Sequence, residues 1–207
     1  MARDTQSIVK MSRREGYALH PKAHKALVKR STMPGQGQQS RGRRGGGASQ
    51  YSLQLREKQK VKRLYGLLER QFSNLMKEAS KKDGESGANL LMFLERRADN
   101  VVYRAGFAPS RRAARQLMSH GHFMLNDVRV DIPSIRLKPG DTLVLRPRST
   151  KTEYFKQHDE TSPAPADIPS WLKVNRKKVE IAISGLPVRE DAELDINEQL
   201  IVEYYSR

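Results

Sequence analysis

Apolar side chains recur at intervals of three and four residues in two long stretches of the chain, and this spacing predicts helices. In the first stretch, residues 49–82, Gly66 predicts a break into a helix pair. The polar, Gly-containing residues 83–89 are expected to form a loop. The second stretch is predicted as one helix that ends at Gly106. Its apolar face comprises Leu91, Leu94, Ala98, Val101, Val102 and Ala105.

A shorter helix followed by two strands is predicted for residues 110–130. Ser110 is a good N-cap, because its hydroxyl can accept a hydrogen bond from an unpaired amide of the first turn. Gly121 follows the helix at a position where a left-handed residue is expected. Phe123 and Leu125 then alternate with their neighbours, which indicates a strand with one buried face.

The same short helix separates apolar from basic side chains. Arg111 and Arg115 are one turn apart and lie opposite the apolar face. We interpret the segment as a small apolar wedge that presents guanidinium groups to phosphate. Replacing both arginines with Ala is then expected to weaken RNA binding and to leave stability nearly unchanged. The apolar face comprises Ala113, Ala114, Leu117 and Met118.

The C-terminal part of the chain predicts more strands and a last helix. Thr142 to Arg146 is predicted as a strand, and a hairpin is expected around Asn175-Arg176. Asp195 is expected to begin the last helix, with Glu198 three residues later in a capping-box arrangement. This tail is too small to fold alone, so we expect it to pack on the helices of residues 49–82.

The predicted fold class is α+β. A mainly helical domain is expected from residues 49–90 and 158–207, including the C-terminal hairpin and helix. Residues 91–157 are expected to form an inserted module of two helices and a small antiparallel sheet. Residues 1–48 are predicted as an extended, basic, Gly/Arg-rich arm. Residues 33–47 have almost nothing to bury, so they are either ordered on a partner or a disordered linker.

Charge decides the class of partner. The formal net charge is +16, and residues 1–50 alone carry 11 basic and 2 acidic side chains. Residues 151–207 carry 8 basic and 11 acidic side chains, so the excess lies in the first 150 residues. Such an excess repels itself unless a polyanion neutralises it, and nucleic acid is the expected partner. A membrane is disfavoured because no basic segment has a strong opposing apolar face.

Catalytic and metal chemistry find little support in the sequence. The chain has no Cys, no apolar run long enough for a membrane span, and no apolar signal-peptide core, which indicates a soluble cytoplasmic protein. His20 and His24 are four residues apart, but no further ligand completes a metal site. His120 and His122 flank Gly121, and they serve either local packing or contact with phosphate or a base. We expect no cofactor, no metal and no enzymatic activity.

The segment LERRADNVVYRAGFAPSRRAARQLMSHGHFMLNDVRVDIPS resembles the RNA-binding module named after small-subunit ribosomal protein S-four. The flanking stretches YSLQLREKQKVKRLYGLLERQF and DINEQLIVEYYSR, SRREG near the start, and Pro34-Gly35-Gln36 extend the resemblance to the bacterial S-four ribosomal protein family. The resemblance covers nearly the whole chain. It implies a ribosome-bound, primary rRNA-binding protein that nucleates assembly.

The resemblance also implies partners and contact residues. Expected partners are the 5′ domain of small-subunit rRNA, protein S-five, with which it would support translational accuracy, other small-subunit proteins, and messenger RNA where it enters. The lysines before Leu64 are assigned either to RNA contact or to a solvated helix face. The RNA-binding residues that we expect are Arg13, Arg14, Arg41, Arg43, Arg44, Lys58, Lys60, Lys62, Arg63, Arg111, Arg112, Arg115, His120, Gly121 and His122.

Two departures from the family pattern affect the expected structure. Some members hold the N-terminal region with a Cys-ligated zinc, which this Cys-free chain cannot bind in that way. The hairpin turn is usually Asn-Gly, whereas Asn126-Asp127 stands here, and we expect a different turn type. The alternative function is that of an RNA-modifying or RNA-handling factor with the same module, which would need a separate catalytic domain.

Overall fold

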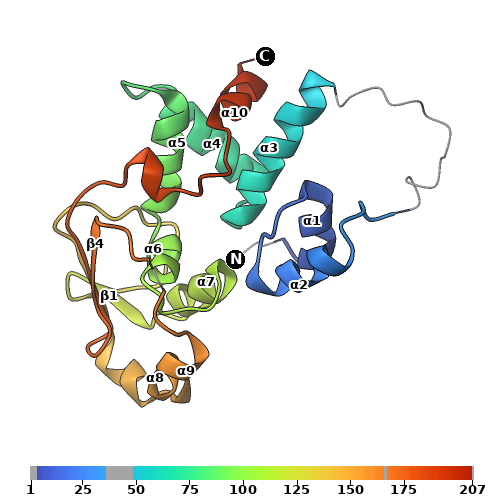
Figure 1. Cartoon of the computed structure of the whole chain (residues 1–207). Coiled ribbons are helices and arrows are strands. Elements are labelled where there is room, and N and C mark those ends of the chain that lie inside the picture. The colour runs from blue at the N-terminus through green and yellow to red at the C-terminus, as the bar shows by residue number, and fades with distance from the viewer. Residues whose placement is uncertain (1–3, 36–48, 166, 207) are drawn as a thin grey trace. The chain divides into compact units, whose positions relative to one another are not determined.

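The structure is a computed structural model that describes residues 4–35, 49–165 and 167–206 (Figure 1). The chain divides into two compact units. Unit 1 is drawn from Met1–Asn89 and Asp195–Arg207, and unit 2 is Leu90–Leu194.

Unit 1 is helical, and the two longest helices of its described residues, α3 (Gln50–Leu64) and α4 (Glu69–Ala79), confirm the predicted helix pair. Gly66, with φ 66°, lies between α3 and α4 in a backbone conformation that L side chains rarely adopt. The last helix packs on α3, as expected, but its cap is Asn197, whose side chain accepts from the Leu200 amide. The helices are α1 (Ile8–Glu15), α2 (Pro21–Lys29), α3 (Gln50–Leu64), α4 (Glu69–Ala79) and α10 (Glu198–Tyr205).

The extended conformation expected for residues 1–48 is wrong for the part that forms α1 and α2. Met11 and Ala23 are buried, and α1 packs on both α2 and α3. His20 is the N-cap of α2, where its Nδ1 accepts from the Lys22 amide, and Pro21 occupies the first helical turn. A few apolar anchors are therefore enough to fold this basic segment onto a longer helix.

The helix predicted to end at Gly106 is two helices, and the predicted loop is shorter. Helix α5 (Ser86–Glu95) begins three residues into the expected loop, and α6 (Ala98–Arg104) follows it after a break. At the break, the Ala98 amide donates to the Ile135 carbonyl at 2.8 Å, and Arg97 forms a β-bridge with Arg136. Backbone groups that would continue the helix are thus used for pairing with residues 133–137.

Unit 2 combines helices with a five-stranded antiparallel sheet of order β2-β1-β3-β5-β4. Strand β5 pairs with β3, so the C-terminal hairpin belongs to this sheet and not to the helical domain, where we expected it. The elements are α7 (Arg111–Ser119), β1 (Phe123–Leu125), β2 (Val128–Val130), β3 (Thr142–Leu145), η2 (Pro147–Lys151), α8 (Glu153–Lys156), α9 (His158–Thr161), β4 (Leu172–Asn175), β5 (Glu180–Ile183) and η3 (Arg189–Asp191).

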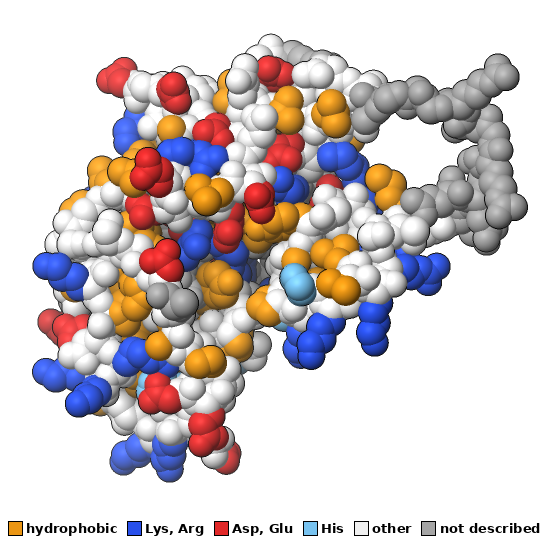
Figure 2. Space-filling view, viewed as in Figure 1, with side chains coloured by type: hydrophobic (Ala, Val, Ile, Leu, Met, Phe, Trp, Pro, Cys, Tyr) orange, Lys and Arg blue, Asp and Glu red, His pale blue; other side chains and the backbone are white. Residues whose placement is uncertain are grey.

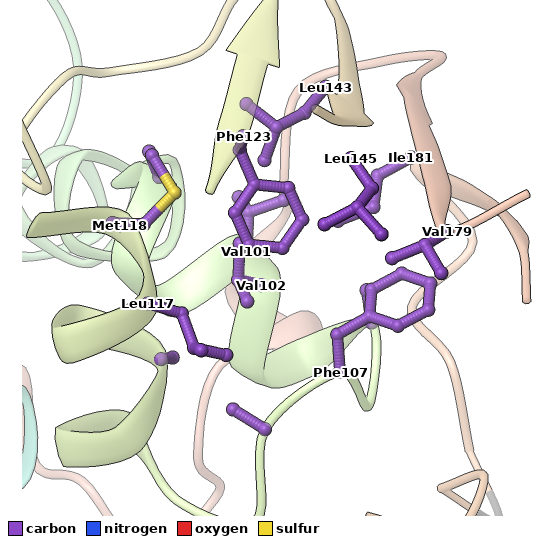
Figure 3. Close-up of a cluster of buried hydrophobic side chains, with 14 of the residues drawn as sticks. Val101, Val102, Phe107, Leu117, Met118, Phe123, Leu143, Leu145, Val179 and Ile181 are labelled. Carbon is purple, nitrogen blue, oxygen red and sulfur yellow. The ribbon is translucent and has the colours of Figure 1, made fainter. Parts of the chain in front are cut away.

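The core of unit 2 lies between α6, α7 and one face of the sheet. Figure 3 shows Phe123 of β1 pointing toward Val101 and Val102 of α6, near Leu145 of β3. Ser110 caps α7 as predicted, since its Oγ accepts from the Ala113 amide at 3.2 Å. The apolar positions predicted on the two helices are mostly buried, which confirms the helical periodicity.

The β1–β2 turn at Asn126-Asp127 has the backbone geometry of an Asn-Gly hairpin turn, although Asp replaces Gly. Asn126 and Asp127 have φ values of 47° and 65°, and two consecutive positive φ angles are the signature of a type I′ turn. The Asn126 side chain also accepts from the Thr142 amide and donates to Asp141, at 2.9 Å each. The expected change of turn type is therefore wrong, because these contacts hold the turn without a Gly.

Candidate nucleic-acid interface

Lys58 is inside unit 1. Its residue is 2% exposed, and its Nζ lies 2.8 Å from Glu69 Oε1 and 4.6 Å from the centre of the Tyr204 ring. Although burial opposes ionisation of Glu69, hydrogen bonds from Lys58, Tyr205 and Lys62 hold the pKa of that carboxyl below its ordinary value. The ammonium therefore links α3 to α4 and α10 and does not reach the surface.

The other cations of α3 are also engaged within unit 1. Lys60 donates to the Asp195 carbonyl at 2.6 Å and pairs with Glu57. Lys62 Nζ lies 3.1 Å from Glu69 Oε2, and Arg63 pairs with Glu15 of α1. These side chains are between 11% and 15% exposed, so the basic run of α3 is largely neutralised by its own unit.

The arginines of α7 take part in a partly buried network of unit 2. Arg111 Nε donates to Asn100 Oδ1 at 2.8 Å, its Nη2 donates to Glu193 Oε1 at 3.0 Å, and its Cζ lies 4.6 Å from the centre of the Tyr103 ring. Arg115 Nη1 lies 3.6 Å from Asp99 Oδ2.

We predicted that Arg111 and Arg115 present their guanidinium groups to solvent, and this network shows that the prediction is wrong. The Arg111 and Arg115 side chains are only 12% and 16% exposed. Replacing both with Ala would break pairs that are shielded from water, so nearly unchanged stability is no longer expected. Arg112, between them, is exposed.

Of the N-terminal arginines that we expected to bind RNA, the structure describes two. Arg13 is held by the chain itself, because its Nε donates to the Thr32 carbonyl at 2.9 Å. Arg14 is exposed on α1. Arg41, Arg43 and Arg44 lie outside the described residues.

The turn at residues 120–122 brings its two imidazoles together. Gly121 adopts φ 67°, the ring centres of His120 and His122 are 6.0 Å apart, and His120 is exposed. His122 Nδ1 lies 3.0 Å from Ser149 Oγ, and its ring packs edge-on against Phe155. Burial, and then the charges of His120 and Arg146, lower the pKa of His122 from its ordinary value of 6.5.

The His122 environment predicts a pH effect on stability. Below about pH 6.5 the unfolded chain takes up a proton on His122 that the folded chain resists, so the wild-type free energy of unfolding falls as the pH falls. We expect this fall to be smaller in His122→Asn, measured by urea unfolding between about pH 8 and 5. His120→Asn removes one of the charges that lower this pKa, so its slope should lie between those of the wild type and His122→Asn. An identical slope in His122→Asn would contradict the assigned shift.

Two further cations lie beside this turn, and the sequence reasoning missed them. A Cβ at Gly121 would lie 2.7 Å from Arg129 Nε, so that guanidinium lies against the turn. The Arg146 amide donates to the His122 carbonyl at 2.8 Å. Their sequence signal was weak, since a single Arg after a turn or after a strand is ordinary. Only the pairing of β1 with β2 and β3 places both beside His122.

Figure 2 shows Lys and Arg side chains on the surface of unit 2 near its strands and α8, and on the surface of unit 1 near α2. Among the described residues, no group of three or more His, Asp or Glu side chains could hold a metal ion. Within the same ranges, no helix has both the length and the apolar character that a membrane crossing requires.

Comparison with known proteins gives matches over most of the chain. The family described as "Ribosomal protein S4/S9 N-terminal domain" matches residues 3–95, and the family described as "S4 domain" matches residues 96–143. Curated proteins named "Small ribosomal subunit protein uS4" are similar over their full length. Those of Chlorobium limicola, Chlorobaculum tepidum and Clostridioides difficile are 49%, 48% and 47% identical, and each alignment covers 100% of both chains.

Proposed function

Because the chain belongs to the uS4 family of small ribosomal subunit proteins, we propose that it acts as a primary binder of the 5′ domain of small-subunit rRNA and nucleates assembly there. It is a structural constituent of the small subunit, and its family is not one of enzymes. The observation that carries this conclusion is the 49% sequence identity with the uS4 protein of Chlorobium limicola, over the full length of both proteins.

The proposed interface is narrower than the set that the sequence suggested. We retain the exposed Arg14, Arg112 and His120, the half-buried His122, and Gly121, which is buried between the two histidines. We also retain the Arg41, Arg43 and Arg44 run, which lies outside the described residues. We leave out Lys58, because an ammonium in a 2% exposed residue has no route to phosphate in this structure.

The other cations of the expected set have intramolecular partners. We propose that they hold their own unit together and contribute to RNA binding through the field of the chain, not through direct phosphate contacts. They are Arg13, Lys60, Lys62, Arg63, Arg111 and Arg115.

The proposal places the protein on cytoplasmic ribosomes, beside protein S-five and near the point where messenger RNA enters. Resemblance of the whole chain to its family supports these neighbours. The alternative of an RNA-modifying factor has no observation in its favour, since the two families match residues 3–143 and the uS4 relatives align with the whole chain.

Competition binding tests the proposed function. We expect the purified protein to bind a 5′-domain rRNA fragment far more tightly than transfer RNA, because phosphate contacts alone do not distinguish the two. The measurement is a titration of labelled fragment against unlabelled transfer RNA over a salt series. Each phosphate contact should contribute about 0.7–0.9 to the slope of log affinity against log salt. Equal affinity for the two RNAs would contradict specific binding.

A further inference from the structure

The sheet of unit 2 has a core face and an outer face, and strand register assigns residues to each. Phe123 pairs with Leu145, and both are buried in the core. Because successive side chains of a strand point to opposite faces, Met124 and its partner Val144 lie on the outer face. Arg129 also pairs with Met124 and therefore shares that face. Met124 and Val144 are only half-buried, so no element of the described chain covers this part of the sheet completely.

Two guanidinium groups approach the same turn from neighbouring strands on this face. His122 and Arg146 stand directly before Phe123 and directly after Leu145, at the same end of the paired strands β1 and β3. The Arg146 guanidinium adds to burial and to His120 in lowering the pKa of His122, so it lies within electrostatic reach of the imidazole. Arg129 extends from β2 and lies against Gly121. Arg146 is joined to His122 by a backbone hydrogen bond of 2.8 Å. The cations therefore flank the turn from β2 on one side and β3 on the other.

These cations differ from the arginines of α7 in their partners. Arg111 and Arg115 are balanced by Glu193 and Asp99, whereas Arg129, Arg146 and Arg148 form no ion pair within the described chain. Arg129 and Arg148 are also exposed. A group of cations without carboxylate partners is electrostatically costly until an anion neutralises it. The sheet side of unit 2 thus carries accessible positive charge that no carboxylate of the described chain neutralises.

The basic area has a defined limit and an apolar centre. Along the row that contains Arg129, Met124 and Val144, the next residue is Glu180 of β5, and its carboxylate ends the positive region. Between the arginines, the Met124 thioether and the Val144 methyl groups offer an apolar surface to ribose rings and base faces. Cations around a small apolar centre suit a sugar–phosphate chain, whose phosphates and sugars can contact both kinds of side chain. They suit an acidic protein surface less well, because its polar groups would need hydrogen-bond partners across the whole contact.

We propose that the outer face of β2, β1 and β3 is an RNA-backbone contact of unit 2, with Arg129 and Arg146 beside the 120–122 turn and Arg148 next to Ser149, the hydrogen-bond partner of His122. The inference rests on the proposed function, because it names a second place where the same RNA is held. It assigns the phosphate contacts of unit 2 chiefly to the sheet and not to Arg111 and Arg115 of α7.

The test is the double variant Arg129→Gln/Arg146→Gln, titrated with the 5′-domain rRNA fragment over a salt series. We expect affinity to fall by about tenfold or more, and the log–log salt slope to fall by about 1.4–1.8, the contribution of two phosphates. Binding of transfer RNA should weaken as well, because backbone contacts carry no sequence information. The matched control is Lys177→Gln/Lys178→Gln, which removes the same charge from the exposed β4–β5 turn and should keep the wild-type slope.

A second variant distinguishes a loss of RNA contact from a folding defect. Met124→Glu places a carboxylate at the centre of the same face without touching the core, and it should weaken RNA binding while near-UV circular dichroism stays native. Equal affinities for the arginine variant and the lysine control would overturn the inference, as would unchanged binding by Met124→Glu. In either case the wild-type preference for the rRNA fragment over transfer RNA still reports separately on the proposed function. The inference would also be overturned if the arginine variant lost binding to an acidic protein or to anionic vesicles while its RNA binding stayed unchanged.

Discussion

Replacing Phe123 with Ala is expected to lower the free energy of unfolding of unit 2 by about 3–5 kcal/mol. Phe123 is 0% exposed, and its ring packs edge-on against Phe155 with centres 6.1 Å apart. It lies on β1, which has hydrogen-bonded strands on both sides, so the surrounding backbone cannot collapse easily into the cavity. The measurement is urea unfolding followed by fluorescence of Trp171, itself buried in the same core.

The neighbouring residue supplies the control for this prediction. Met124→Ala removes an apolar side chain from the same strand, but from its outer face, and should cost about 1 kcal/mol or less. If Met124→Ala were as destabilising as Phe123→Ala, the assignment of the two sheet faces would be wrong. The proposed RNA contact on the outer face would then lose its structural basis.

Replacing Glu95 with Ala is expected to be similarly damaging, at about 3–5 kcal/mol, because it leaves the partly buried guanidinium of Arg104 and the buried amide of Asn100 without their partner. Glu95 is 0% exposed, and its oxygens accept from Arg104 at 3.0 and 3.1 Å and from Asn100 Nδ2 at 2.7 Å. Asn100 in turn accepts from Arg111. The loss should therefore loosen α7 as well as α6.

Denaturant unfolding together with hydrogen exchange of α7 amides checks this result. Glu160→Ala, which removes an exposed carboxylate from α9, should leave both the unfolding midpoint and the α7 exchange rates unchanged. A destabilisation of less than about 1 kcal/mol by Glu95→Ala would show that Arg104 and Asn100 find water or new partners at little cost.

Local sequence signals predicted α3, α4, α7 and the two strands of the first hairpin. The apolar spacing that predicted buried faces depends only on residues within two turns, and Gly66 and Ser110 act within their own turns. The break before Ala98 was missed because it depends on pairing with Ile135, far along the chain. The placement of β5 beside β3 was missed for the same reason, since periodicity predicts a strand but not its neighbour.

The charged residues were harder to interpret than the apolar ones. Helical spacing alone puts Lys58 on the same face as Val61 and Tyr65, both buried, and this could have indicated an internal position. For Arg111, no local signal exists, because Glu193 is 82 residues away in the sequence. A basic face predicted from helical spacing thus identifies the class of partner. Ion pairs with residues far along the chain then decide which of its cations remain available to that partner.

Nuclease footprinting of small-subunit rRNA with this protein tests the central claim most directly. The account predicts strong protection confined to the 5′ domain at a protein concentration that leaves the other domains unprotected. It also predicts that part of this protection is lost with Arg129→Gln/Arg146→Gln and retained with Lys177→Gln/Lys178→Gln. Weak protection spread evenly over all domains, unchanged by either variant, would contradict it.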